Sequence, residues 1–211
     1  MAKIDELKAA VEIGRAKIVP GLVQASLDEG VEAGDVLNSM IDSMGVVGEK
    51  FKNGEIFVPE MLIAAKAMKK GVEVLKPHLS SDEAGAKGII ILGTVAGDLH
   101  DIGKNLVGMM FESSGFEVID LGVDAPIEKF ISTYEANPNT KIIACSALLT
   151  TTMPALKDTV AAINSQPWRD KVKVMVGGAP ITPEFAVQIG ADAYTPDAAT
   201  AAAKACELIE C

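Results

Sequence analysis

The segment 96–107, AGDLHDIGKNLV, places acidic side chains on both sides of a histidine. Asp98 and Asp101 flank His100, and Gly103 follows. A carboxylate that accepts from one ring nitrogen fixes the tautomer of a histidine and makes the other nitrogen a better metal ligand. The simpler interpretation is a loop histidine beside capping residues, with Asp101 stabilising the next helix N-terminus. The segment alone leaves both interpretations open.

Histidines and cysteines are too few for most other metal sites. The chain has two histidines, His78 and His100, so any site that needs a histidine cluster is excluded. Cys145 lies in the apolar run IIACSALL and is expected to be a small buried side chain. Cys206 and Cys211 have no neighbouring histidine, so we expect reduced thiols and no zinc site.

The first part of the chain has the periodicity of amphipathic helices. Apolar residues recur at steps of three and four over about 33–51 and from residue 59 onward. Two further helical segments are expected before them, from about 4 to 13 and from about Arg15 to Asp28, with Pro20 inside the latter. Four helices with short connections predict a bundle over residues 1–80. A polar linker follows over residues 81–87.

From residue 88 onward the pattern changes to short aliphatic runs separated by helix-length segments. The runs cover residues 88–95, 117–121, 141–146 and 172–176, with a weaker one at 193–195. Runs that are apolar on both faces are typical of parallel strands buried between helices. The pattern predicts a doubly wound α/β domain, flavodoxin-like or Rossmann-like, over residues 88–211. Ligands of such sheets bind beyond the carboxyl ends of the strands.

Three loops at that end of the predicted sheet carry polar or small residues: 96–107, 146–154 (SALLTTTMP) and 177–180 (GGAP). The glycines of the first loop do not match a nucleotide fingerprint, and Lys104 is followed by Asn105, so nucleotide hydrolysis is excluded. No G-x-S-x-G elbow is present. A response-regulator receiver would place a phosphorylatable aspartate after the third strand, where Ser146 and Ala147 stand.

Together these loops resemble the cobalamin-binding domain of methionine synthase. The similarity is closer still to the corrinoid proteins of methylotrophic methyltransferase systems of the methanol, methylamine or betaine type. The motifs D-x-H-x-x-G, S-x-L and a double glycine are matched in order by Asp98, His100 and Gly103, by Ser146 and Leu148, and by Gly177 and Gly178. The helical segment 44–68 also looks like the bundle of that family, so the resemblance spans nearly the whole chain.

The resemblance implies a cobalamin or related corrinoid whose own base is displaced from cobalt by His100, the lower axial ligand. Asp98 and a hydroxyl residue would complete a relay behind the histidine. The aligned hydroxyl residue is Thr152, with Thr150 and Thr151 as alternatives.

Further cofactor contacts are implied for residues of both domains. Those in the α/β domain are Asp98, Asp101, Ile102, Gly103, Ser146, Leu148, Thr150, Gly177 and Gly178, of which the serine, the leucine and the double glycine would line a channel for the nucleotide tail. Small residues suit such a channel because backbone can then approach the ligand closely. In the bundle, Phe51 and Val58 align with residues that cap the methyl group, and ordinary core packing is the alternative for both.

The function implied by the resemblance is that of a methyl carrier, with no turnover of its own. It would pass a methyl group on cobalt from a substrate methyltransferase to a second methyltransferase with a pterin or thiol acceptor. A reductive activation protein would be a third partner. The bundle would have to move to admit these partners, with a hinge near residues 78–88. Alternatives are a passive corrinoid storage or delivery protein, the cobalamin subunit of a mutase, and a light-sensing regulator.

Charge and hydropathy limit the expected cellular location of the protein and the classes of partner it can bind. The formal net charge of −10 disfavours binding to nucleic acid or anionic lipid. No apolar run approaches the roughly 18 residues of a membrane span. The N-terminal segment is amphipathic and charged, unlike a signal peptide. We expect a cytoplasmic protein without nucleic-acid or membrane partners.

Overall fold

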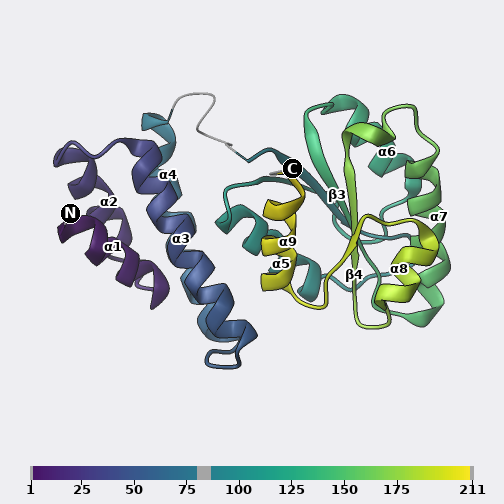
Figure 1. The fold of residues 1–211 in the computed structure, drawn as a ribbon, viewed down its shortest axis with the longest axis horizontal. Coiled ribbons are helices and arrows are strands. Elements are labelled where there is room, and N and C mark those ends of the chain that lie inside the picture. Colours follow the sequence, from purple (N-terminus) through teal and green to yellow (C-terminus); the bar gives the residue numbers. More distant parts are fainter. Residues whose placement is uncertain (1, 80–86, 210–211) are drawn as a thin grey trace. The chain divides into compact units, whose positions relative to one another are not determined.

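The structure is a computed structural model that describes residues 2–79 and 87–209 (Figure 1). The chain divides into two compact units, with the main division in the sequence between residues 86 and 87. Most of the expected linker, residues 81–86, lies outside the described residues. No helix within the described ranges is both long and apolar enough to cross a membrane.

The first unit consists of four helices: α1 (Ala2–Glu12), α2 (Val19–Asp28), α3 (Ala33–Lys52) and α4 (Val58–Leu75), followed by one short 3-10 turn at Lys76–His78. Its apolar stripes form a core that includes Leu7, Val11, Val23, Val36, Met40, Met44, Met61 and Met68. The expected start of the second helix at Arg15 is wrong, because α2 begins at Val19 and has Pro20 in its first turn. Proline has a fixed φ and no N–H, which suits that first turn and no later position.

The second unit has a five-stranded parallel sheet in the order β2-β1-β3-β4-β5. The strands are β1 (Ile89–Thr94), β2 (Glu117–Asp120), β3 (Thr140–Ser146), β4 (Lys173–Gly177) and β5 (Ala193–Tyr194). The helices between and after them are α5 (Ile102–Ser113), α6 (Ile127–Ala136), α7 (Met153–Asn164), α8 (Pro183–Ile189) and α9 (Ala198–Ile209). In Figure 1, α5 and α9 lie on one side of the sheet, and α6, α7 and α8 lie on the other. The predicted fold class is confirmed.

Both faces of the central strands are buried, as their continuous apolar sequences require. On the side of α6 to α8, Cys145 is part of the core, and burial raises the pKa of its thiol to about 12. The rings of Tyr134 and Trp168 stack in the same layer with centroids 3.8 Å apart. Cys145 is therefore a packing residue, as its apolar sequence context predicts.

The strand order reverses direction between β1 and β3. The helices that follow these two strands, α5 and α7, cover opposite sides of the sheet (Figure 1). Open α/β sheets bind ligands at the carboxyl end of such a switch point. The loops after β1 and β3 are the two that carry the D-x-H-x-x-G and S-x-L residues.

Candidate functional site

A tight turn carries the chain from β1 to Asp98. The Asp98 N–H donates to the carbonyl oxygen of Val95 at 3.2 Å. Gly97, the third residue of the turn, has φ +81°, which is the left-handed value that a type II turn requires at this position. The turn directs the aspartate inward, and Asp98 is fully buried.

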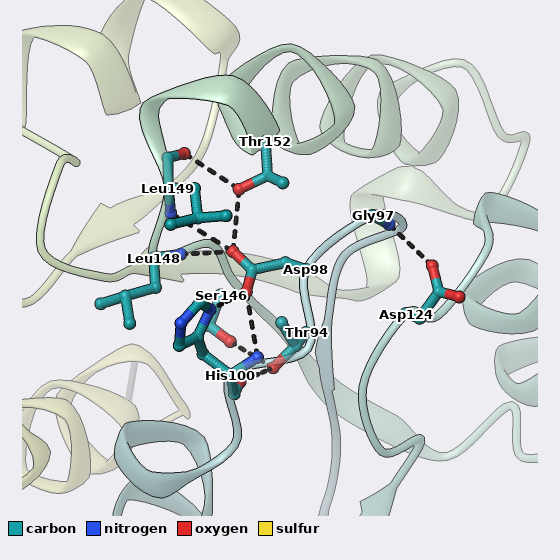
Figure 2. A network of polar contacts seen from close by, with 9 residues as sticks. All are labelled: Thr94, Gly97, Asp98, His100, Asp124, Ser146, Leu148, Leu149 and Thr152. Carbon is teal, nitrogen blue, oxygen red and sulfur yellow. Dashed lines mark hydrogen bonds and ion pairs between the residues drawn. The ribbon is translucent and has the colours of Figure 1, made fainter.

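The carboxylate of Asp98 collects donors from two loops (Figure 2). Its Oδ1 accepts from the His100 backbone N–H at 3.1 Å and lies 2.7 Å from the His100 ring atom Nδ1. Its Oδ2 accepts from the Leu148 N–H at 2.6 Å, the Leu149 N–H at 3.4 Å and the Thr152 hydroxyl at 2.8 Å. A buried carboxylate is tolerated here because both oxygens are satisfied.

The same contacts settle the ionisation of Asp98. Burial raises its pKa, but the hydrogen bonds from Leu148, His100 and Thr152 outweigh burial and hold the pKa well below the ordinary range. An ionised carboxylate can only accept hydrogen bonds. Nδ1 of His100 must therefore carry the proton, which leaves the lone pair of Nε2 free in the neutral ring.

The ring of His100 is half-exposed. The side chain is 49% exposed, and Nε2 has no hydrogen-bond partner among residues 2–79 and 87–209. A fixed tautomer with an open Nε2 is the arrangement of metal-binding histidines. The simpler interpretation also accounts for part of the loop, because Asp101 accepts from the Asn105 side chain at 3.1 Å and its carbonyl receives the Asn105 N–H.

Of the three candidate threonines, the structure brings Thr152 to Asp98. Its hydroxyl lies 2.8 Å from Asp98 Oδ2 and 2.9 Å from the carbonyl oxygen of Leu149, two acceptors that share one proton. Thr150 and Thr151 are exposed, and neither makes a hydrogen bond to Asp98 within the described part of the chain. The hydroxyl is placed by the 3-10 turn that precedes α7.

Ser146 is connected to His100 through Thr94, a residue that lies outside the three motifs. The Thr94 hydroxyl at the end of β1 donates to the His100 carbonyl oxygen at 3.0 Å, and Ser146 Oγ lies 2.9 Å from Thr94 Oγ1 (Figure 2). A hydroxyl has one proton, so Ser146 is the donor in its contact with Thr94. The parallel register pairs Thr94 with Ser146 directly, and only the strand order reveals that pairing.

Of the double glycine, Gly178 is required by contacts within the protein, while Gly177 stands in a tighter than usual place. A Cβ on Gly178 would lie 1.9 Å from the carbonyl oxygen of Ala147, and φ of Gly178 is +129°. A Cβ on Gly177 would lie 3.2 Å from the carbonyl oxygen of Thr195. By contrast, a Cβ on Gly103 would meet nothing within 4 Å. The space next to Gly103 is therefore open. Helix stability does not explain the glycine, because alanine is the better helix former.

Exposed apolar side chains lie beside the histidine in the sequence or on the loop that donates to Asp98. Leu99 is 72% exposed and Ile102 84% exposed, and Leu148 and Leu149 are also exposed. Leu99 and Leu149 were not among the expected site residues, and their sequence signal is weak because an isolated leucine in a loop suits many roles. Large apolar side chains beside an open polar group are typical of a ligand site.

Phe51 and Val58 lie at the end of α3 and the start of α4. Phe51 is half-buried and Val58 is 41% exposed, so Val58 is not a core residue. The neighbouring Phe57, which the sequence did not predict as a site residue, is 68% exposed.

Comparisons with known proteins show the family of the chain. Residues 3–76 and residues 88–205 each match a family described as a B12 binding domain. Dimethylamine corrinoid protein 1 of Methanosarcina acetivorans is 41% identical over 208 residues, which cover 98% of this chain and 92% of that protein. The chain belongs to the B12-binding corrinoid proteins. Members of this family act in methyl transfer, and the cofactor of this corrinoid protein is cobalamin or a related corrinoid.

Two solved structures are similar over the whole corrinoid protein. A cobalamin-binding protein from Desulfitobacterium hafniense has a TM-score of 0.83 and 28% identity, covering 99% of this chain and 100% of that one. A chain of the methanol:cobalamin methyltransferase complex from Methanosarcina barkeri has a TM-score of 0.85 and 29% identity, covering 99% of this chain and 80% of that one.

The residues at the end of the sheet fit a corrinoid. The half-exposed ring of His100 would offer Nε2, the nitrogen that does not face Asp98, to cobalt. Leu99 and Ile102 offer exposed apolar surface on either side of that histidine. The open space at Gly103 leaves room beside the ligand loop.

Proposed function

We propose that this corrinoid protein binds its cofactor with the cofactor's own base displaced and with His100 Nε2 as the lower axial ligand of cobalt. We further propose that it carries a methyl group from a substrate methyltransferase to a second methyltransferase. The proposal rests on the series of hydrogen bonds from Thr152 to Asp98 and from His100 to Asp98, because this series leaves Nε2 as the ring nitrogen without a partner in the described residues. The corrinoid supplies a cobalt that accepts and releases the methyl group.

The protein's own part in this cycle is to hold the histidine and its proton. Asp98 stays ionised and accepts a hydrogen bond from the Nδ1–H of His100 whether or not Nε2 is coordinated. A carboxylate next to an imidazole favours a positive charge on the ring. Thr152 and Leu148 keep the carboxylate in place throughout.

The relatives support the proposed partners. The similar chain in a methanol:cobalamin methyltransferase complex supports a methyltransferase as the protein that delivers the methyl group. The identity to a dimethylamine corrinoid protein supports a methylated amine as the methyl source, bound by that partner. A pterin- or thiol-dependent methyltransferase and a reductive activation protein complete the set of proposed partners.

Electron paramagnetic resonance of the cobalt(II) form tests the axial ligand. The protein is reconstituted with cobalamin and labelled with nitrogen-15 histidine, and the axial nitrogen splitting is measured. We expect the splitting to change with the label, to disappear in His100→Ala and to persist in His78→Ala, since His78 is exposed and lies in the other unit. A splitting that is unaffected by the label would show that the cofactor's own base remains on cobalt.

A transfer assay separates a methyl carrier from a passive storage protein. The protein is loaded with methylcobalamin and mixed with a candidate acceptor methyltransferase. Loss of the methyl group to the acceptor, followed by remethylation with the substrate methyltransferase, is expected of a carrier. A protein that releases intact cofactor and exchanges no methyl group with either partner would be a storage or delivery protein.

A further inference from the structure

The segment after β2 holds the chain on both sides of His100. Upstream of the histidine, the Gly97 N–H donates to Asp124 Oδ1 at 2.7 Å, and the Asp124 N–H donates to the Asp98 carbonyl oxygen at 2.9 Å. Figure 2 shows Asp124 reaching Gly97 from a separate loop. Asp124 therefore binds the turn that aims Asp98, through its side chain and its backbone together.

Downstream of the histidine, the contact is an ion pair. The side chain of Lys104, in the first turn of α5, is 1% exposed, and its Nζ lies 2.6 Å from Asp120 Oδ2. A cation near a helix N-terminus is unfavourable with the helix dipole, and a buried charge needs a partner. The pairing with Asp120, supported by Asn105 Oδ1 at 2.7 Å, compensates for both and fixes the start of α5 to the end of β2.

The backbone of Asp124 shows that its side chain matters. Its φ is +49°, and it is the one non-glycine residue with positive φ in the described ranges. Glycine would adopt this conformation without strain, and aspartate tolerates it better than most residues. A non-glycine residue held in this region at a functional site indicates that the surrounding contacts outweigh the strain. Here that contact is the hydrogen bond to Gly97.

We propose that residues 120–125, here named the brace, are a positioning element for the axial histidine. Asp124 fixes the backbone of Asp98, and Asp120 fixes Lys104, so the loop that carries His100 is held at both ends before the cofactor arrives. Asp124 and Lys104 are positioning residues, because neither contacts the His100 ring. The inference rests on the proposed role of His100, and it predicts that the brace controls the orientation and tautomer of that ring.

The first test uses the protein without cofactor. Nitrogen-15 spectra of the His100 ring are recorded for the wild type, Asp124→Asn and Asp124→Gly, with the His78 ring as the internal reference. Asparagine keeps both an acceptor oxygen and tolerance of positive φ, whereas glycine keeps only the tolerance. We expect a protonated Nδ1 and an unprotonated Nε2 in the wild type and in Asp124→Asn, and averaging of the two signals in Asp124→Gly.

The second test measures the affinity of the same proteins for hydroxocobalamin. Loss of an interaction that orients a metal-binding histidine typically weakens metal binding about 10-fold to 100-fold. We expect Asp124→Gly to bind about 10-fold more weakly than Asp124→Asn, and Lys104→Met to show a loss in the same direction from the other end of the loop. Circular dichroism establishes that each variant is folded.

The outcomes separate the brace from the function on which it rests. Equal affinities of Asp124→Gly and Asp124→Asn would overturn the brace, and so would a loss of affinity with an unchanged His100 ring spectrum, since the effect would then not pass through the histidine. If instead the wild type binds cobalamin without a histidine nitrogen on cobalt, the proposed function fails. The ring spectra still decide in that case whether the brace orients His100.

Discussion

At the scale of single residues, the hydroxyl of Thr152 donates to a carboxylate that solvent does not reach. Thr152→Val keeps the shape of the side chain and removes the donor, so Asp98 Oδ2 loses one of its hydrogen bonds. We expect the apoprotein to lose about 1–3 kcal/mol of stability in urea unfolding at neutral pH. Thr152→Ser should retain most of the wild-type stability, because the hydroxyl remains.

Thr159 offers a matched control for that substitution. It is equally buried, but its hydroxyl donates only to the Ala155 carbonyl oxygen of its own helix, at 2.8 Å. Such a bond adds little to helix stability, so Thr159→Val should have a smaller effect. If the two valine variants unfold at the same urea concentration, the bond to Asp98 contributes nothing particular.

The ionisation of Asp98 links stability to pH. Its pKa is lower in the folded chain than in the unfolded chain, where it is about 3.9. The resulting stabilisation is fully present above that value and is lost progressively as the pH falls from there toward the lower pKa of the folded chain. The difference in free energy of unfolding between the wild type and Asp98→Asn should therefore shrink as the pH falls below about 4. Urea titrations of both proteins at each pH measure it. A difference that does not shrink below about pH 4 would contradict the assignment.

At the scale of elements, the hydrophobic periodicity of the sequence predicts the helices and strands. Continuous aliphatic runs located the five strands, and spacing located the four helices, whereas the start of α2 was wrong because Pro20 was placed inside a helix that it begins. Asp98 and His100 were predicted from a motif, and Thr152 was predicted from the family resemblance, with Thr150 and Thr151 as alternatives. Thr94 and Asp124 were missed, because their contacts depend on which strands are neighbours and on the conformation of a turn.

Gly103, in the first turn of α5, and Gly178, directly after β4, should respond in opposite ways to alanine. At Gly103 a Cβ meets no atom, so Gly103→Ala should stabilise the apoprotein by about 0.5 kcal/mol and weaken corrinoid binding if the cofactor uses that space. At Gly178 a Cβ collides with Ala147, so Gly178→Ala should destabilise by more than about 2 kcal/mol. Thermal unfolding with and without cobalamin measures both. Unchanged affinity in Gly103→Ala would show that the space is not used.

At the scale of the whole molecule, the two units are expected to have separate tasks. In the proposed function the α/β unit provides the axial ligand, and we propose that Phe51 and Val58 of the helical unit cover the methyl group. Two different partners would have to reach that group in turn, so we propose that the units move. An engineered disulfide between the units should leave cobalamin binding intact and stop methyl transfer until it is reduced. Full transfer by the oxidised protein would contradict this division.

The stacking of Trp168 on Tyr134 gives the protein an optical reporter. Trp168 is the single tryptophan of the chain, and both tyrosines, Tyr134 and Tyr194, also belong to the α/β unit. Emission excited in the near ultraviolet therefore follows the melting of the sheet alone, while far-ultraviolet dichroism records the helices of both units. If the two signals change at different denaturant concentrations, the difference between their midpoints measures the difference in stability between the two units.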